Sequence, residues 1–478
     1  MTQPRHPSGG ATTTTTTGEP SSVVALRWQA RALAALPAEH TPPTPTPSPP
    51  RWLAGTAAAR EENDLSVVEY DPLRREARSA SRWVHPAEVW AVAPHPTEAS
   101  GDAGLLVATA WQAAPTAQQC RPAAAGSGND HNDARAARSG WGATVWRAPC
   151  GGAKTAALVR ACDLEEEQQA GAERTAAAAV PVRTVAWWSS TPDEAGGSGA
   201  QDALLTASAD GALRVWRIGD GGAARMEASF GQVGGAEAEL WAAEPHPTRP
   251  GVVAAATSAG AVVYDARQAA TSGGLVGSFG CRRGEGAGGP ESSTRCGSCG
   301  LARWRAGARC VSWAPPGAQA GGWRLASAGD DGRLRFWDLR TLSSSSSSSS
   351  CPAPLLTLGG GHGHAVSHLA HHPQHDSLLA SAGSDGGCVL WHTPRLAAGG
   401  GGVAPAAGAS AEQDGKVWAF DDPACGGDDA LRGVAWAGGA GAGGGGGVGD
   451  AWALAALAHD GRVAVHHVPR AVRYAVLV

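Results

Sequence analysis

The stretch SAGDDGRLRFWDLR, residues 327–340, decides the fold. Small and apolar residues lead into an Asp-Gly pair, and the segment that follows alternates apolar residues before it ends on Trp-Asp. Period-two alternation is typical of a half-buried strand, and Asp-Gly supplies the positive φ that a tight hairpin turn requires. The stretch therefore predicts two antiparallel strands joined by a short turn.

The same pattern recurs along the chain. Related stretches are LLTASADGALRVWRI (204–218), VVAAATSAGAVVYDAR (252–267), LLASAGSDGGCVLWHT (378–393) and ALAALAHDGRVAVHHV (453–468). Three copies keep a hydroxyl residue, an aspartate and a tryptophan at the same offsets: Thr206, Asp210 and Trp216; Ser327, Asp331 and Trp337; Ser381, Asp385 and Trp391. A further strand precedes each pair, as in VWAVAPHP, LWAAEPHP and LRGVAWAGG. The repeat unit is therefore a small antiparallel sheet.

These units resemble the WD-repeat family. In that family the hydroxyl residue, the aspartate and the tryptophan join a histidine from the preceding loop, and this network ties the strands of one blade together. His364, in GHGH, fits that position for the sixth unit, whereas the fifth unit has no obvious histidine. We count seven units and expect an all-β, seven-bladed WD-repeat β-propeller. Eight blades, one of them irregular, is the alternative.

Low-complexity segments interrupt the repeat. We expect a disordered N-terminal tail over 1–20 and a single propeller over 21–478, because Gly-, Ser- and Pro-rich segments bury too little apolar surface to fold. The expected inserts lie near 37–50, 112–140, 270–300, 342–352, 397–413 and 437–450. No strand precedes the first unit outside the Thr-rich tail, so RYAVLV (473–478) is predicted to be the outer strand of the last blade.

Composition and motifs argue against several classes of function. A net charge of −5 gives no global basic field for nucleic acid, no window of 18 apolar residues predicts a membrane span, and ten cysteines in 478 residues are too few for a disulfide scaffold. Nucleophile-elbow, P-loop and dinucleotide motifs are missing, so we expect no enzyme and no cofactor. The pair Cys296 and Cys299 lacks a second ligand pair, and the repeat explains part of the histidine-rich 362–375, so we expect no metal.

Two arginines are candidate partner-binding residues. Arg340 follows Trp-Asp in WDLR, and Arg267 follows Tyr-Asp in YDAR. An exposed arginine at this place resembles the docking box of WD-repeat substrate receptors of cullin-RING ubiquitin ligases. The simpler interpretation is that each arginine pairs with a carboxylate of its own blade.

The two ends of the chain carry a closer resemblance. ALRWQARAL (25–33), HPAEVWAVAPHP (85–96) and DGRVAVHHVPRAVRYAVLV (460–478) are similar to the EARP- and GARP-interacting WD-repeat protein family, also described as the tumour-suppressing subtransferable candidate family. That resemblance implies a non-enzymatic adaptor without catalytic residues. Its partners would be subunits of the EARP and GARP tethering complexes, which act in endosomal recycling and in retrograde transport to the trans-Golgi network.

We accordingly expect a monomeric ring in the cytoplasm, held peripherally at endosomes and the trans-Golgi network by its partners, without direct membrane insertion. A substrate receptor of a cullin-RING ligase, docking through Arg267 and Arg340, is the alternative function. The chain departs from the family in its long Gly, Ser and Pro tracts and in TSAG (257–260), where the fourth unit lacks the turn aspartate.

Overall fold

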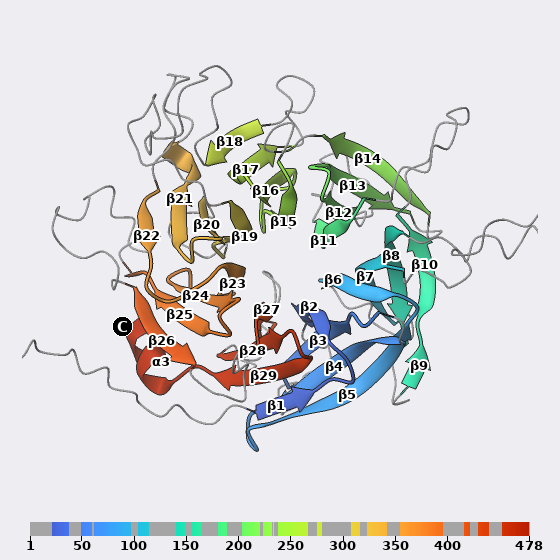
Figure 1. Ribbon diagram of the computed structural model, residues 1–478, viewed down its shortest axis with the longest axis horizontal. Helices are drawn as coiled ribbons and strands as arrows, with labels where there is room; N and C mark the ends of the chain where they lie inside the picture. The colour runs from blue at the N-terminus through green and yellow to red at the C-terminus, as the bar shows by residue number, and fades with distance from the viewer. Residues whose placement is uncertain are drawn as a thin grey trace, which may run out of the picture.

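Seven small, mainly antiparallel sheets stand around a central channel and form a closed ring (Figure 1). This computed structural model describes residues 22–37, 49–59, 62–96, 104–113, 140–149, 155–164, 180–188, 203–219, 223–231, 233, 238–265, 275–279, 307–315, 323–341, 354–394, 415–420, 429–438 and 452–477. The chain is a seven-bladed β-propeller, as the repeat predicts. The tail over 1–20 and nearly all of the expected inserts lie outside the described residues.

Each blade begins with its innermost strand. Blade 1 contains β2 (Ala30–Ala35), β3 (Arg51–Thr56), β4 (Asn63–Asp71), β5 (Glu76–His85) and the added β9 (Thr155–Ala157). Blade 2 contains β6 (Glu88–Pro94), β7 (Leu105–Gln112), β8 (Trp141–Ala148) and β10 (Val159–Asp163). Blade 3 contains β11 (Val182–Trp188), β12 (Ala203–Ser208), β13 (Leu213–Ile218) and β14 (Ala224–Phe230). Blade 4 contains β15 (Leu240–Pro245), β16 (Val252–Thr257), β17 (Gly260–Asp265) and β18 (Leu275–Phe279).

The remaining blades follow the same plan. Blade 5 contains β19 (Ala308–Trp313), β20 (Arg324–Gly329), β21 (Leu334–Asp338) and β22 (Leu356–Leu358), with a 3₁₀ turn over Leu339–Thr341. Blade 6 contains β23 (Val366–His371), β24 (Leu378–Gly383), β25 (Cys388–His392) and β26 (Lys416–Phe420). Blade 7 contains β27 (Leu431–Trp436), β28 (Ala453–Ala458), β29 (Arg462–His467) and β1 (Ser22–Ala25).

The predicted hairpin turns join the second and third strands of four blades. Gly211, Gly332, Gly386 and Gly461 have φ values of 80°, 68°, 79° and 95°. A side chain would be strained at these angles, which glycine adopts freely. The Asp-Gly signal in the sequence therefore marks real turns.

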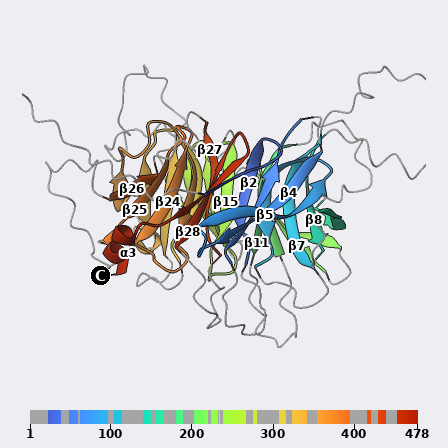
Figure 2. The ribbon, with the colours of Figure 1, turned by 90° about the horizontal axis from the view of Figure 1, so that it is seen from below.

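Blade 7 closes the ring with a strand from the other end of the chain. The N-terminal β1 pairs with β29, with Ser22 opposite Val465 and Ala25 opposite Arg462. The prediction that RYAVLV supplies this strand is wrong, because Arg470–Leu477 form the helix α3, which packs at the outside of the ring (Figure 2). Pairing the first strand with the last repeat satisfies an edge that would otherwise stay open.

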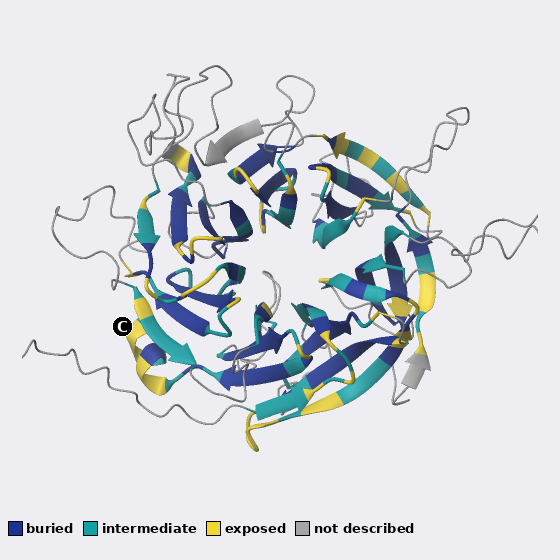
Figure 3. Cartoon of the chain, in the orientation of Figure 1, coloured by how far each residue is buried: buried dark blue, intermediate teal, exposed yellow. Residues whose placement is uncertain are grey.

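The core of the ring lies between blades. Seven clusters of buried apolar side chains are present among the described residues, one at each junction between neighbouring blades. The second strand of each blade is almost wholly buried and the third is mostly buried, whereas the innermost strand is largely half-buried and the outer strand is more exposed (Figure 3). A blade therefore buries its faces only when both neighbours are present, as expected of a repeat architecture.

Tryptophans also tie neighbouring blades by hydrogen bonds. The indole N–H groups of Trp187, Trp313 and Trp436 donate to backbone carbonyls of the preceding blade at 2.9, 3.0 and 2.9 Å. A histidine of that preceding blade packs on each ring: His95 on Trp187, His246 on Trp313 and His372 on Trp436. Each of these histidines stands directly before a proline in the sequence. Their packing on the tryptophans gives them a structural role.

Candidate interaction surface

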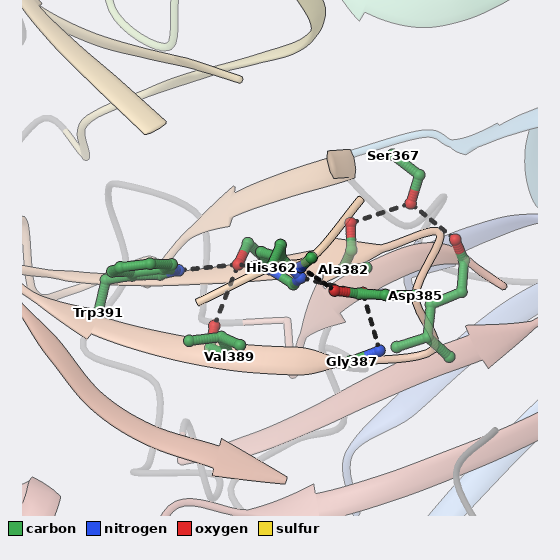
Figure 4. A network of polar contacts seen from close by, with 10 residues as sticks. His362, Ser367, Ala382, Asp385, Gly387, Val389 and Trp391 are labelled. Carbon is green, nitrogen blue, oxygen red and sulfur yellow. Dashed lines mark hydrogen bonds and ion pairs between the residues drawn. The ribbon is translucent and has the colours of Figure 1, made fainter. Parts of the chain in front are cut away.

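Blade 6 holds a complete polar network inside the sheet (Figure 4). The Trp391 indole N–H donates to Ser381 Oγ at 2.8 Å, and Ser381 Oγ lies 2.6 Å from His362 Nε2. His362 Nδ1 lies 3.2 Å from Asp385 Oδ1. A carboxylate can only accept, so Nδ1 carries the proton and Nε2 accepts from the serine hydroxyl. Every group in this chain of hydrogen bonds is thereby satisfied.

The electrostatics of Asp385 agree with this arrangement. Burial raises the pKa of the Asp385 carboxyl, but hydrogen bonds from His362 and from the backbone N–H groups of Gly363 and Gly387 outweigh burial. The net effect holds its pKa well below its ordinary value. The aspartate is therefore ionised and fixed in the turn, which suits a structural role.

The histidine of this network differs from the sequence prediction. His364 was expected, but the structure places His362 against Ser381 and leaves His364 exposed. Both histidines lie in GHGH, two residues apart, and a glycine-rich loop can bring either into the blade. Gly361 packs so closely on Trp391 that a Cβ there would clash with the indole. This close approach places the adjacent His362, rather than His364, beside Ser381 and Trp391.

Blade 2 contains a second network that the sequence did not reveal. Trp146 donates to Thr109 Oγ1 at 2.8 Å, and Thr109 Oγ1 lies 3.2 Å from His85 Nε2. His85 Nδ1 lies 2.8 Å from the Ala87 carbonyl, which takes the place of the aspartate. The residues between β7 and β8 lengthen the spacing from Thr109 to Trp146, so this set does not share the fixed offsets of the other blades.

Blades 3 and 5 keep the tryptophan bond, and no histidine joins it among the described residues. Trp216 donates to Thr206 Oγ1 at 2.9 Å, and Trp337 donates to Ser327 Oγ at 2.8 Å. The turn aspartates pair instead with arginines four residues along the chain: Asp210 with Arg214 and Asp331 with Arg335. Nine of the ten residues proposed for the blade networks thus bond to a side chain of their own blade in the described structure, whereas His364 does not.

Of the two candidate docking arginines, only Arg340 lies within the described residues. Asp338 holds the Arg340 guanidinium through both oxygens, with Nε to Oδ1 at 3.0 Å and Nη2 to Oδ2 at 2.6 Å. The side chain is 47% exposed. Arg267, Cys296 and Cys299 lie outside the described residues. Within the described ranges, no three His, Cys, Asp or Glu side chains are grouped so that they could hold a metal ion.

A different set of residues recurs at one mouth of the central channel. The innermost strand of every blade has a register shift of one residue at its second or third position, so one extra residue bulges from each strand. We call these seven bulge residues the entry ring: Arg31, Trp90, Arg183, Trp241, Arg309, Ser367 and Arg432. The innermost strand is the first of each blade around the ring (Figure 1). Each bulge lies near the start of such a strand, so the seven bulges lie at the same end of the channel.

Arginines and tryptophans of the entry ring stack on one another from blade to blade. The guanidinium of Arg31 in blade 1 lies 3.8 Å from the centre of the Trp90 ring in blade 2. The guanidinium of Arg183 in blade 3 lies 5.9 Å from the centre of the same ring. Arg183 also lies 5.1 Å from the Trp241 ring, and Arg309 lies 3.8 Å from it. The contacts form an unbroken ladder across blades 1 to 5, which fixes long side chains in a defined arrangement.

Blades 6 and 7 complete the entry ring. Ser367 Oγ lies 2.7 Å from the carbonyl of Leu431 in the next blade, which bonds the two bulges together. Arg432 is exposed and lies near Arg31, because its charge acts on the Arg31 guanidinium. The pattern was not predicted from the sequence, although the aligned inner strands share the signal of an apolar residue followed by Arg, Trp or Ser.

Among the described residues, no helix combines the length and the apolar character that crossing a lipid bilayer requires.

Comparison with known proteins gives two results. The model of the WD domain, G-beta repeat, matches residues 304–338 and 353–392, which are in blades 5 and 6. Curated relatives include EARP-interacting protein 1 of Caenorhabditis elegans, 29% identical over 32% of this chain and 38% of that protein. EARP-interacting protein homolog of Gekko japonicus is 27% identical over 32% of this chain and 37% of its own length. EARP and GARP complex-interacting protein 1 of Homo sapiens is 23% identical over the same shares.

The match therefore spans less than two fifths of the length of these relatives. The resemblance stated from the sequence is confirmed by their names, by the repeat model and by the seven blades. The chain is a seven-bladed β-propeller with WD repeats matched in blades 5 and 6, and it is similar to the EARP- and GARP-interacting proteins.

Proposed function

We propose that this chain is a non-enzymatic adaptor that associates with EARP and GARP tethering complexes in endosomal recycling and in endosome-to-Golgi retrograde transport. The observation that carries the proposal is the similarity to curated relatives named for interaction with those complexes. A rigid ring with loops and side chains gathered at one end suits binding, because partner-binding residues on such folds sit where a scaffold positions them. The adaptor would work as a monomer in the cytoplasm, held at endosomes and the trans-Golgi network by its partners.

The geometry supports the entry ring as the docking surface. It is the place where the described residues gather four arginines and two tryptophans, the residue types that dominate binding hot spots. The network inside blade 6, by contrast, has its hydrogen bonds satisfied. A partner that reaches the channel mouth therefore meets prearranged side chains.

Affinity purification of the tagged chain tests the proposal. We expect tether subunits to be recovered with the wild-type chain and lost with the Trp391→Ala variant, which lacks a fully buried core residue. Recovery of no tether subunit with the folded wild-type chain would contradict the proposal.

The same experiment addresses the alternative of a cullin-RING substrate receptor. No observation on Arg340 favours that function, since Asp338 already holds its guanidinium. Cullin-linked partners that bind the wild type and vanish with Arg267→Ala/Arg340→Ala, without tether subunits in either sample, would replace the proposed function by this one.

A further inference from the structure

We propose that the entry ring binds an extended acidic segment of polypeptide, whose carboxylates are held by Arg31, Arg183 and Arg432 along the mouth of the channel. The inference deepens the proposed function, on which it rests only in taking the natural ligand to be part of a partner protein. It assigns the ring a ligand chemistry that the blade networks do not have.

These three arginines carry positive charge that ion pairs within the described structure do not neutralise. In the part of the chain that the structure describes, neither Arg31, Arg183 nor Arg432 forms an ion pair, whereas Arg309 pairs with Asp330 at 2.6 Å. Glu88 is the acidic group near Arg31, and it accepts a hydrogen bond from the Trp90 indole at 3.3 Å. Asp429 and Asp460, the acidic groups whose charges act on His459, pair with Arg462 instead.

Part of each of two guanidinium groups is buried without a hydrogen-bond partner in the described structure. The Nε–H groups of Arg31 and Arg183 are buried and donate to no acceptor in the described structure. Burial, followed by the charge of Arg432, lowers the pKa of the Arg31 guanidinium, and the charges of Arg432 and Arg31 add to burial in lowering the pKa of His459. Unpaired buried donors cost stability, and an anionic ligand would satisfy them.

Stacking on tryptophan does not remove the need for an anion. A cation over an indole gains about 0.5–1 kcal/mol at an exposed site, and it leaves the guanidinium N–H groups unsatisfied. The planar guanidinium presents a fork of donors that matches a carboxylate. The tryptophans therefore hold the arginines in place, and the donors stay available for a ligand.

The shape of the ladder favours an extended ligand over a compact one. The stacked side chains run through five consecutive blades, from Arg31 in blade 1 to Arg309 in blade 5. Arginines alternate with tryptophans along this arc, so the guanidinium groups are spread over several blades. A peptide with acidic side chains spaced by small residues can follow such an arc, whereas an inositol phosphate could contact only part of it.

Fluorescence anisotropy with a labelled peptide of alternating glutamate and glycine tests the inference on the full chain. The matched probe is the same peptide with glutamine in place of glutamate. We expect the glutamate peptide to bind and the glutamine peptide to fail, with affinity falling as salt screens the charges. Arg31→Gln/Arg183→Gln should weaken binding about tenfold or more for each arginine removed.

The control variant is Arg225→Gln/Arg470→Gln, which removes the same charge at two exposed positions away from the ring. It should bind the glutamate peptide like the wild type. Equal binding of both peptides, or equal losses in the two double variants, would overturn the inference. Displacement of the peptide by inositol hexakisphosphate at a lower concentration than by unlabelled peptide would assign the ring to a compact anion, and selective binding to anionic vesicles would assign it to a membrane surface.

Two baits keep this inference separate from the proposed function. If Arg31→Gln/Arg183→Gln abolishes peptide binding but still recovers tether subunits, the tether binds elsewhere and the ring has another acidic ligand, which overturns its role in the proposed adaptor. If the wild type binds the peptide but recovers no tether subunit, the proposed function fails and the ligand chemistry of the ring stands.

Discussion

The interior of blade 6 and the entry ring are both polar features of a fold held mainly by apolar packing, and they differ in whether their donors have partners. In blade 6 the groups of Trp391, Ser381, His362 and Asp385 bond to one another in sequence. At the entry ring, buried donors of Arg31 and Arg183 meet no acceptor among the described residues. A polar position that recurs with its partners is structural, whereas one that recurs without them points to a ligand.

The blades differ in how complete their polar networks are. Blade 6 has the complete network, blade 2 replaces the aspartate with a carbonyl, and blades 3 and 5 pair the aspartate with an arginine. Blade 4 has Tyr264 in place of the tryptophan, and its Thr257 hydroxyl bonds to the Gly260 carbonyl at 2.8 Å. The network is therefore an addition to interblade packing, which every blade has.

The largest expected effect comes from the centre of blade 6. Trp391 is 0% exposed, so Trp391→Ala leaves a cavity and an unpaired serine, and should lower the free energy of unfolding by about 3–5 kcal/mol. Trp241→Ala in the half-buried entry ring is the matched change and should cost clearly less. Urea unfolding followed by circular dichroism measures both, and equal losses would contradict the division between core and binding surface.

The next effect isolates the histidine. Ser381→Ala leaves both Trp391 and His362 without their partner and should cost about 2–3 kcal/mol. Ser327→Ala in blade 5 leaves only Trp337 unpaired and should cost about 1–2 kcal/mol. The same urea titration compares the two variants. A larger loss for Ser327→Ala would show that the histidine adds nothing to blade 6.

Acid should weaken the blade interiors through their neutral histidines. His85 is 1% exposed, and burial lowers its pKa from 6.5 to about 4. As pH falls from about 6.5 towards 4, the unfolded chain gains a proton that the folded chain resists, so the free energy of unfolding decreases, by about 2 kcal/mol from this residue at pH 5. Above about pH 6.5 the residue adds no pH dependence.

His85→Gln should remove that part of the acid sensitivity, measured as the difference in urea midpoint between pH 7.5 and pH 5. His364→Gln, at an exposed position, is the control and should leave the difference unchanged. Loss of acid sensitivity in the control but not in His85→Gln would reverse the assignment.

The smallest effect on stability is expected at the entry ring. Removing one unpaired guanidinium by Arg183→Gln deletes a stacking contact but also relieves a buried donor, so the free energy of unfolding should change by no more than about 0.5 kcal/mol. A loss as large as that of Ser381→Ala, in the same urea titration, would make Arg183 a structural residue.

Much of the fold was predictable from the sequence because its signals are local. Alternation of apolar residues and Asp-Gly turns, as at Asp331 and Gly332, depend on neighbours in the chain. The closing strand was missed because Ser22–Ala25 is short and its partner lies at the opposite end of the chain. His362 was missed because GHGH offers two histidines, and only the packing of Gly361 on Trp391 decides between them.

The entry ring was hidden for a different reason. A bulge adds one residue to a strand and breaks the alternation that reveals strands, so Arg31 or Trp90 alone looks like an irregularity. Only the register of all seven innermost strands shows that these residues are equivalent. The blade network of His85, Thr109 and Trp146 was hidden because the long segment before β8 removes the fixed spacing.

The central claim is that the entry ring serves partners and the blade networks serve the fold. The most direct measurement purifies the tagged chain as wild type and as Arg31→Gln/Arg183→Gln, and records both the recovery of tether subunits and the urea midpoint of each bait. We predict that the double variant loses the tether subunits and keeps the wild-type midpoint. Recovery equal to the wild type, or a loss of recovery accompanied by a fall in the midpoint as large as that of Ser381→Ala, would contradict the claim.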